Sequence, residues 1–194
     1  MSFPTTAILD ACNRTETPLS NGGTWSSWLS SQLRDIGTSA TAASTSGSFA
    51  TAYWNVQQFT DCEVYATVVG AASTIYLFAR ANSAATNYYE VWWAAGTSNA
   101  EIHSDAGYLA NATPGVTISP GDVVGFSVVG HVITSYYNGT QTGQVVDSTY
   151  SSGYLAMAVT TGATNGDGFN NFGGGAPVLS QASSYHPSRM PLGV

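Results

Sequence analysis

The chain has 194 residues, of which 43% are hydrophobic and 8% are charged, and its formal net charge is −7. This length suits one all-β domain, alone or with tails, and the hydrophobic content is ample for a core. Four arginines are the only Lys or Arg cations, so the chain lacks the basic patch that nucleic acids or anionic membranes require.

The N-terminus has no basic region followed by a long apolar one, so we expect no signal peptide. No apolar run approaches the roughly 18–20 residues of a membrane span. The sequence therefore predicts a protein made in a cytoplasm. If it acts outside the cell, we expect it to leave by lysis or by assembly into a particle.

The first half of the chain predicts short strands separated by turn residues. An unpatterned Gly/Ala/Ser/Thr stretch over Ile36–Ser48 indicates a loop with at most one weak strand. The runs rich in β-branched and aromatic residues predict strands at Thr5–Asp10, Phe49–Asn55, Asp61–Val69, Thr74–Ala81 and Asn87–Ala94.

The second half continues the pattern of short strands. Asn138-Gly139 is a strong signal for a type I′ hairpin turn. Strands are expected at Asn99–His103, Gly107–Ala110, Asp122–Val129, His131–Asn138, Gln141–Asp147, Gly153–Thr160 and Gly166–Gly173. No window has the period of a capped helix, so the sequence predicts an all-β, antiparallel, two-sheet sandwich or jelly roll over residues 1–175. Residues 176–194, with three prolines, read as an extended C-terminal arm.

The three strands from Asp61 to Ala94 divide into two sets of side chains, because successive residues of a strand face opposite sides. One set is apolar and predicts a core face: Cys62, Val64, Ala66, Val68, Ile75, Leu77, Ala79, Tyr89, Val91 and Trp93. The other set mixes aromatic and charged residues, which is typical of a groove that meets water or a sugar: Glu63, Tyr65, Thr67, Tyr76, Phe78, Arg80, Tyr88, Glu90 and Trp92.

The second set contains the candidate carbohydrate-binding residues. Tyr76, Tyr88 and Trp92 offer flat apolar surfaces for sugar rings, and Arg80 and Glu90 could orient hydroxyl groups. An alternative is that the aromatic residues pack under a loop or against another subunit, with Arg80 and Glu90 as a cross-strand ion pair.

Two cysteines, Cys12 and Cys62, are too few for a disulfide framework or a zinc site. Each occupies a position where a strand would bury an apolar side chain, which favours two buried thiols. A bridge between them requires the first strand to lie beside the Asp61 strand.

Several short motifs carry a resemblance to a known family. Leu9-Asp10-Ala11-Cys12-Asn13-Arg14, with Leu19 and Trp25 following, resembles the start of laminin-G/concanavalin-like jelly rolls. Phe59–Val64 is similar to their F-x-D-x-E-V strand, Tyr137-Asn138-Gly139 to their hairpin, and Gly168–Phe172 to their closing strand. The resemblance spans Ile8 to Gly173 and departs from the family where Cys12 replaces an aromatic residue.

This combination resembles virion proteins of tailed bacteriophages of actinobacteria, namely minor tail and head-decoration proteins. The resemblance implies a non-enzymatic accessory protein on the virion surface, with tail or capsid subunits as partners, many copies or a homo-oligomer, and host glycan as a ligand. In the unpatterned arm, Tyr185, His186 and Met190 are the candidate residues for binding a partner. The alternatives are a free carbohydrate-binding lectin module or a concanavalin-like glycoside hydrolase.

Retaining hydrolases of this kind need two carboxylates about 5–5.5 Å apart. Asp61 and Glu63 share a strand face, but the leading glutamate of the hydrolase motif is replaced by Phe59. The pattern therefore favours a protein without enzymatic activity. No cofactor is expected, although Asn165, Asp167 and Asn170 offer hard oxygen ligands that suit calcium in a turn.

Overall fold

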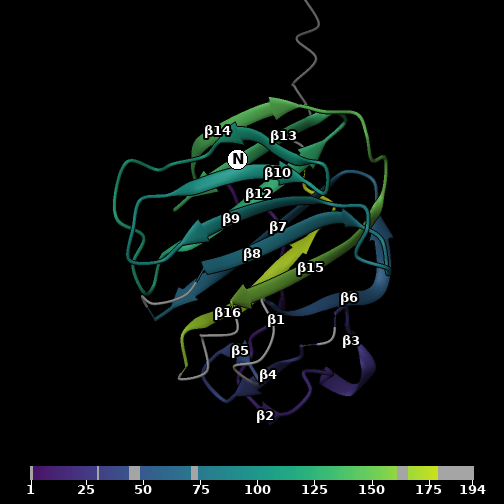
Figure 1. The fold of residues 1–194 in the computed structure, drawn as a ribbon, viewed down its shortest axis with the longest axis vertical. Coiled ribbons are helices and arrows are strands. Elements are labelled where there is room, and N and C mark those ends of the chain that lie inside the picture. The colour runs from purple at the N-terminus through teal and green to yellow at the C-terminus, as the bar shows by residue number, and fades with distance from the viewer. Residues whose placement is uncertain (1, 30, 44–48, 71–73, 161–165, 179–194) are drawn as a thin grey trace, which may run out of the picture.

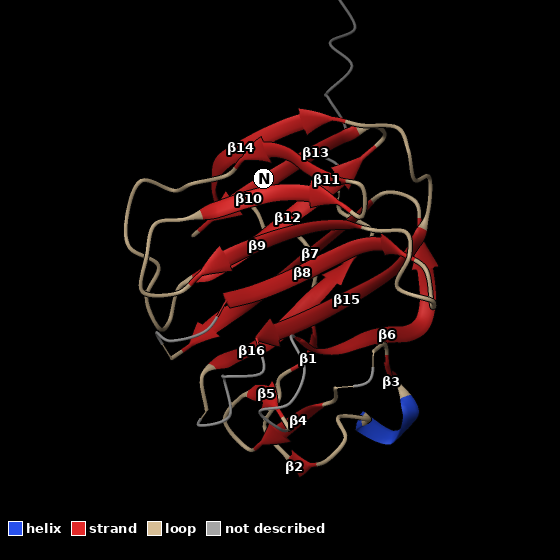
Figure 2. Cartoon of the chain, viewed as in Figure 1, coloured by secondary structure: helices blue, strands red, loops and turns tan. Residues whose placement is uncertain are grey.

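The computed structural model describes residues 2–29, 31–43, 49–70, 74–160 and 166–178. Over these residues the chain forms two antiparallel sheets stacked face to face (Figure 1). Apart from a 3-10 turn at Asn21–Gly23, drawn blue in Figure 2, the described residues contain strands, turns and loops. Among them, no helix has the length and apolar character needed to cross a membrane.

The first sheet has nine strands within the described residues. Eight of them follow the order β14-β13-β12-β7-β16-β5-β4-β2, and β1 pairs with β16. The bounds are β1 Ile8–Asp10, β2 Thr15–Glu16, β4 Leu33–Ile36, β5 Ala40–Ala42, β7 Cys62–Val69, β12 Val123–Val129, β13 Val132–Tyr137, β14 Thr140–Val146 and β16 Gly168–Gly175.

The second sheet has seven strands within the same described ranges, in the order β11-β10-β9-β8-β15-β6-β3. In Figure 1 its central strands lie in front of the first sheet. The bounds are β3 Trp25–Ser27, β6 Phe49–Phe59, β8 Thr74–Ala81, β9 Tyr89–Ala94, β10 Ala100–Ser104, β11 Gly107–Asn111 and β15 Gly153–Thr160.

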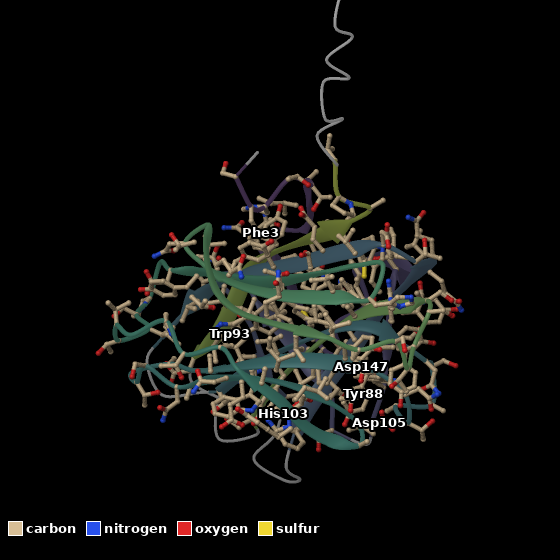
Figure 3. All side chains as sticks on the ribbon, turned by 90° about the horizontal axis from the view of Figure 1, so that it is seen from above. Phe3, Tyr88, Trp93, His103, Asp105 and Asp147 are labelled. Atoms are coloured by element: carbon tan, nitrogen blue, oxygen red, sulfur yellow. The ribbon has the colours of Figure 1, made fainter. Side chains whose placement is uncertain are left out.

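The core lies between the sheets and contains every residue of the predicted core face. None of those ten side chains, from Cys62 to Trp93, is more than 1% exposed. Phe126, Phe169 and Phe172 join them among the largest fully buried side chains. The period-2 alternation of the sequence therefore identified the inner face correctly, and Trp93 lies between the two layers in Figure 3.

The strand pattern confirms the predicted fold class of an all-β, two-sheet antiparallel sandwich. The predicted Asn138-Gly139 turn joins β13 to β14: Tyr137 pairs with Thr140, and both turn residues have positive φ, as a type I′ turn requires. Three short strands, β2, β3 and β4, were not predicted individually, because runs of two to four residues carry too little periodicity. β5 falls within Ile36–Ser48, where the sequence allowed at most one weak strand.

The outer face of the three strands from Asp61 to Ala94 does not form one groove, as the sequence had suggested. β7 belongs to the nine-stranded sheet, whereas β8 and β9 belong to the seven-stranded sheet. Strands of both sheets bury every second side chain in the shared core. The hydrophobic pattern therefore cannot distinguish a hairpin within one sheet from a connection that crosses between the sheets. Consequently Glu63 and Tyr65 lie on one side of the molecule, and Tyr76, Tyr88 and Trp92 lie on the other.

Candidate functional site: an aromatic hollow on the seven-stranded sheet

The outer face of the seven-stranded sheet carries a hollow of about 230 Å³. Its floor comes from β8, β9 and β15, and one wall comes from the segment that follows β3. The residues that define this aromatic hollow are Trp28, Phe49, Tyr76, Phe78, Tyr88 and Glu90. Two of the predicted sugar-stacking residues, Tyr76 and Tyr88, therefore lie in one site together with Glu90.

The rings of the hollow hold one another in edge-to-face contacts. Trp28 packs against Phe78 with ring centroids 4.8 Å apart and against Tyr88 at 5.7 Å. Phe49 meets Tyr76 at 4.9 Å. The indole nitrogen of Trp28 donates to the carbonyl of Asn82 at 2.8 Å, which fixes that ring over the sheet. Edge-to-face pairs of this kind contribute roughly 0.5–1.5 kcal/mol each, so the walls are preorganised.

Glu90 is the acidic group of the hollow. It sits on β9 between Phe78 of β8 and His103 of β10, its partners in the two sheet registers. Within the described part of the chain, no hydrogen bond or ion pair reaches its carboxylate. Burial raises the pKa of Glu90 to about 7, although the nearby His103 works in the opposite direction. The aromatic surroundings therefore disfavour the charged form.

The aromatic surface continues beyond the hollow along β9, β10 and β11. Trp92 lies two residues after Glu90 on the same strand face, and its ring is 6.5 Å from that of His103. His103 packs edge-on against Tyr108 at 5.7 Å, and its Nε2 contacts a carboxylate oxygen of Glu101 at 2.7 Å. Figure 3 places Tyr88, His103 and Asp105 on the outer side of this sheet. The site therefore extends as a partly exposed platform beside a deeper pocket.

Arg80 does not belong to this site, in contrast to the sequence-based prediction. A bulge at Arg80, which has φ of 50°, shifts the register of β8 against β15 and turns the side chain away from the aromatic face. Its buried guanidinium donates to the carbonyl oxygens of Thr60, Tyr150 and Gly130 at 2.7–2.8 Å. Arg80 therefore links three turns at one end of the sandwich.

The two carboxylates considered for hydrolysis have other roles in the fold. Asp61 accepts a hydrogen bond from the backbone of Gly130 at 2.8 Å and lies 3.6 Å from Arg80. Glu63 is 2% exposed and accepts four hydrogen bonds of 2.6–3.1 Å from the backbone and hydroxyl groups of Thr5 and Thr6. Glu63 thus anchors the N-terminal segment to the outer face of the nine-stranded sheet.

Another acidic cluster brings the ligand atoms of Asp10, Cys12 and Asp35 within 4.8 Å of one another. Here Arg14 supplies the positive charge, because its guanidinium lies 2.6 Å from Asp10 and 3.7 Å from Asp35. Trp25 donates to Asp10 as well, at 2.7 Å. Burial, followed by the charges of Asp10 and Asp35, raises the pKa of the Cys12 thiol. These partners explain the cluster as a structural ion-pair network.

The two cysteines are buried free thiols, as the preferred interpretation predicted. β16 lies between β1 and β7, so the strand adjacency that a bridge would need is not present. Burial raises the pKa of Cys62 to about 12.

The predicted calcium ligands lie partly outside the described residues. Asn165 falls there, while the Asn170 side chain donates to the carbonyl of Thr38 at 3.2 Å. The backbone carbonyl of Asp167 accepts from Thr41 at 2.9 Å. Calcium binding at this turn stays a prediction. The candidate arm residues Tyr185, His186 and Met190 also lie outside the described residues.

Sequence reasoning missed two walls of the hollow, Trp28 and Phe49. Trp28 lies in a segment with no clear strand pattern, whereas Phe49 begins the predicted strand that forms β6. For both residues, the sequence distance from β8 and β9 hides the contact. An available signal was the placement of Trp28 after two serines, Ser26 and Ser27, since a large aromatic residue in a polar loop needs a partner for its ring.

No protein-family model matches the chain, and no curated protein resembles it significantly in sequence. Solved structures do resemble its fold. The carbohydrate-binding module CBM66 from Bacillus subtilis superposes with a TM-score of 0.62 and 14% identity, covering 80% of this chain and 98% of the module.

A protein of unknown function with a galectin-like fold, also from Bacillus subtilis, gives a TM-score of 0.63 at 11% identity and covers 88% of this chain and 96% of its own. This chain has a galectin-like and concanavalin-like sandwich fold. The exoplasmic/lumenal domain of VIP36, in a Ca²⁺- and Man2-bound form, gives 0.58 at 8% identity, covering 92% of this chain and 90% of that domain. A putative glycosyl hydrolase from Parabacteroides distasonis is also among the similar structures.

Proposed function

We propose that the protein is a non-enzymatic carbohydrate-binding module that takes sugar rings on the outer face of its seven-stranded sheet. The observation that carries this proposal is the aromatic hollow with the adjoining ring of Trp92. Sugar rings present flat apolar faces bordered by hydroxyl groups, and concave sites with aromatic walls and few polar groups suit such ligands. The volume of about 230 Å³ is below the roughly 300–1,000 Å³ typical of drug-sized ligands, so we expect one ring in the hollow and others on the platform.

Similarity to carbohydrate-binding proteins supports the same proposal at the level of fold. The sequence-based idea of a bacteriophage virion protein rests only on the sequence resemblance, whereas glycan binding also has support from the site. A hydrolase is less well supported, because Asp61 and Glu63 are engaged in holding turns and the N-terminal segment.

A glycan array followed by calorimetric titration of the hits tests the proposal. Trp92→Ala should weaken binding at least about tenfold, which corresponds to about 1.4 kcal/mol. Tyr136→Ala is the matched control, because Tyr136 stacks on Phe3 at 4.1 Å as an aromatic pair of the nine-stranded sheet. It should leave binding unchanged.

Two results would count against the proposed site or function. An empty array would argue against glycan binding altogether. Loss of binding in Tyr136→Ala, with binding retained in Trp92→Ala, would move the site to the other sheet.

A further inference from the structure

Among the described residues, the carboxylate of Glu90 has no hydrogen-bond or ion-pair partner. Other acidic side chains of the molecule with low exposure are compensated: Asp10 contacts Arg14 and Trp25, and Glu63 accepts four hydrogen bonds. A carboxylate surrounded by rings carries a desolvation cost that usually requires a partner. Glu90 therefore differs from these carboxylates, because no described side chain offers it a hydrogen bond or ion pair to offset its desolvation cost.

Among the described residues, two of the arginines are engaged away from this carboxylate. The chain has no lysine, Arg80 is committed to three carbonyls, and Arg14 lies in the Asp10 network. His103 is the cationic candidate facing Glu90 from β10, and its Nε2 is engaged by Glu101. The aromatic side chains around Glu90 are Phe78 and Tyr76 from β8, Tyr88 just before β9, and Trp92 on β9.

Aromatic rings around a carboxylate are the surroundings that an organic cation prefers. Ring faces attract an ammonium group by roughly 0.5–2 kcal/mol, most strongly where water is excluded. The formal net charge of −7 also favours approach of a cation to this protein.

We infer that the aromatic hollow binds the protonated amine of an amino sugar, with Glu90 as its counter-ion and the rings of Tyr76 and Tyr88 beside it. This inference rests on the proposed carbohydrate-binding function and specifies its ligand class. Neutral sugars would stack on the Trp92 platform but would not provide a cation to pair with the Glu90 carboxylate.

Methyl glycosides that differ only at C2 provide the sharpest probe. Each of the gluco and galacto series offers a free amine, an N-acetyl group or a hydroxyl group on the same ring. Nuclear magnetic resonance titration should show at least one amine form binding about tenfold more tightly than its N-acetyl and hydroxyl counterparts. Glu90→Gln should remove that difference while its unchanged far-ultraviolet circular dichroism shows that the fold is kept.

Glu101→Gln is the matched control, since Glu101 lies on the neighbouring strand of the same sheet and its side chain is 37% exposed. It should keep the preference for the amine. If both variants lost the preference for the amine equally, the overall negative potential of this face would explain the attraction. That result would overturn the role of Glu90.

A second readout is proton release. Because burial raises the pKa of Glu90 to about 7, an ammonium that binds its ionised form at pH 6 should displace a proton. Titrations in buffers of different ionisation enthalpy measure this release, and Glu90→Gln should abolish it.

The possible failures separate the two proposals. Neutral glycans that bind through Trp92, with no preference for an amine, would overturn this inference and leave the proposed function in place. An empty glycan array together with no binding of any methyl glycoside would overturn both.

Discussion

Glu90 should make the protein less stable as the pH rises, and replacing it by Gln should remove that effect. Burial raises its pKa from the usual 4.5 to about 7 in the folded chain. In the unfolded chain the carboxyl group ionises near its ordinary value. Between these two values the folded state holds the proton more tightly, so stability falls from about pH 4.5 to pH 7 and then levels off.

The size of this effect follows from the two pKa values. A difference from 4.5 to about 7 corresponds to about 3 kcal/mol, since each unit is worth about 1.36 kcal/mol. Water at the mouth of the hollow reduces the value, so we expect about 1–3 kcal/mol. Glu90→Gln keeps the shape of the side chain and removes its charge. The difference in stability between this variant and the parent should therefore shift in favour of the variant by this amount from pH 4.5 to pH 8.

Urea unfolding of both proteins at pH 4.5 and pH 8 measures the change. For a chain of this length, 1 kcal/mol shifts the melting temperature by roughly 2–4 °C, so thermal unfolding provides an independent check. Glu101→Gln should not reproduce the gain, because its carboxylate is partly in water. If parent and Glu90→Gln lose stability in parallel between the two pH values, the hollow is hydrated in solution and the argument for a desolvated carboxylate fails.

Substitutions at two further residues, Glu63 and Arg80, test the structural roles assigned to their charges. Glu63→Gln should lower the free energy of unfolding by roughly 2–3 kcal/mol, because one of its two oxygens becomes a donor facing the donors of Thr5 and Thr6; a thermal midpoint equal to that of the parent would refute the anchoring role. Arg80→Met should cost roughly 2–4 kcal/mol in urea unfolding because three carbonyls lose a charged donor. Arg80→Lys should be intermediate, and a neutral effect of both would contradict the role assigned to the bulge.

The fold class could be predicted because the alternation of apolar residues is strong in the long strands. β8 begins and ends where the pattern placed it, at Thr74 and Ala81, and its core residues Ile75 and Leu77 are fully buried. The assignment of strands to sheets could not be predicted, because Val64 of β7 and Leu77 of β8 are equally apolar and face the same core from opposite sides.

The candidate site could be predicted only in part for a related reason. Tyr76, Tyr88 and Glu90 share the expected face, since strict alternation holds through them. Arg80 follows the same alternation in the sequence, but a bulge of one residue reverses the direction of its side chain. Trp28 reaches the site from a loop, and a contact of that kind depends on the tertiary fold.

The chain segments at either end of the described structure lie together, on the side of the molecule away from the aromatic hollow. The backbone nitrogen of Val178 donates to the hydroxyl of Thr5 at 3.0 Å, and Figure 3 shows Phe3 across the sandwich from Tyr88 and His103. A surface, particle or fused domain joined through either segment would therefore leave the aromatic face pointing outward. Many copies mounted in this way would display their hollows side by side, so that weak single contacts could add up to strong avidity on a repeating polymer.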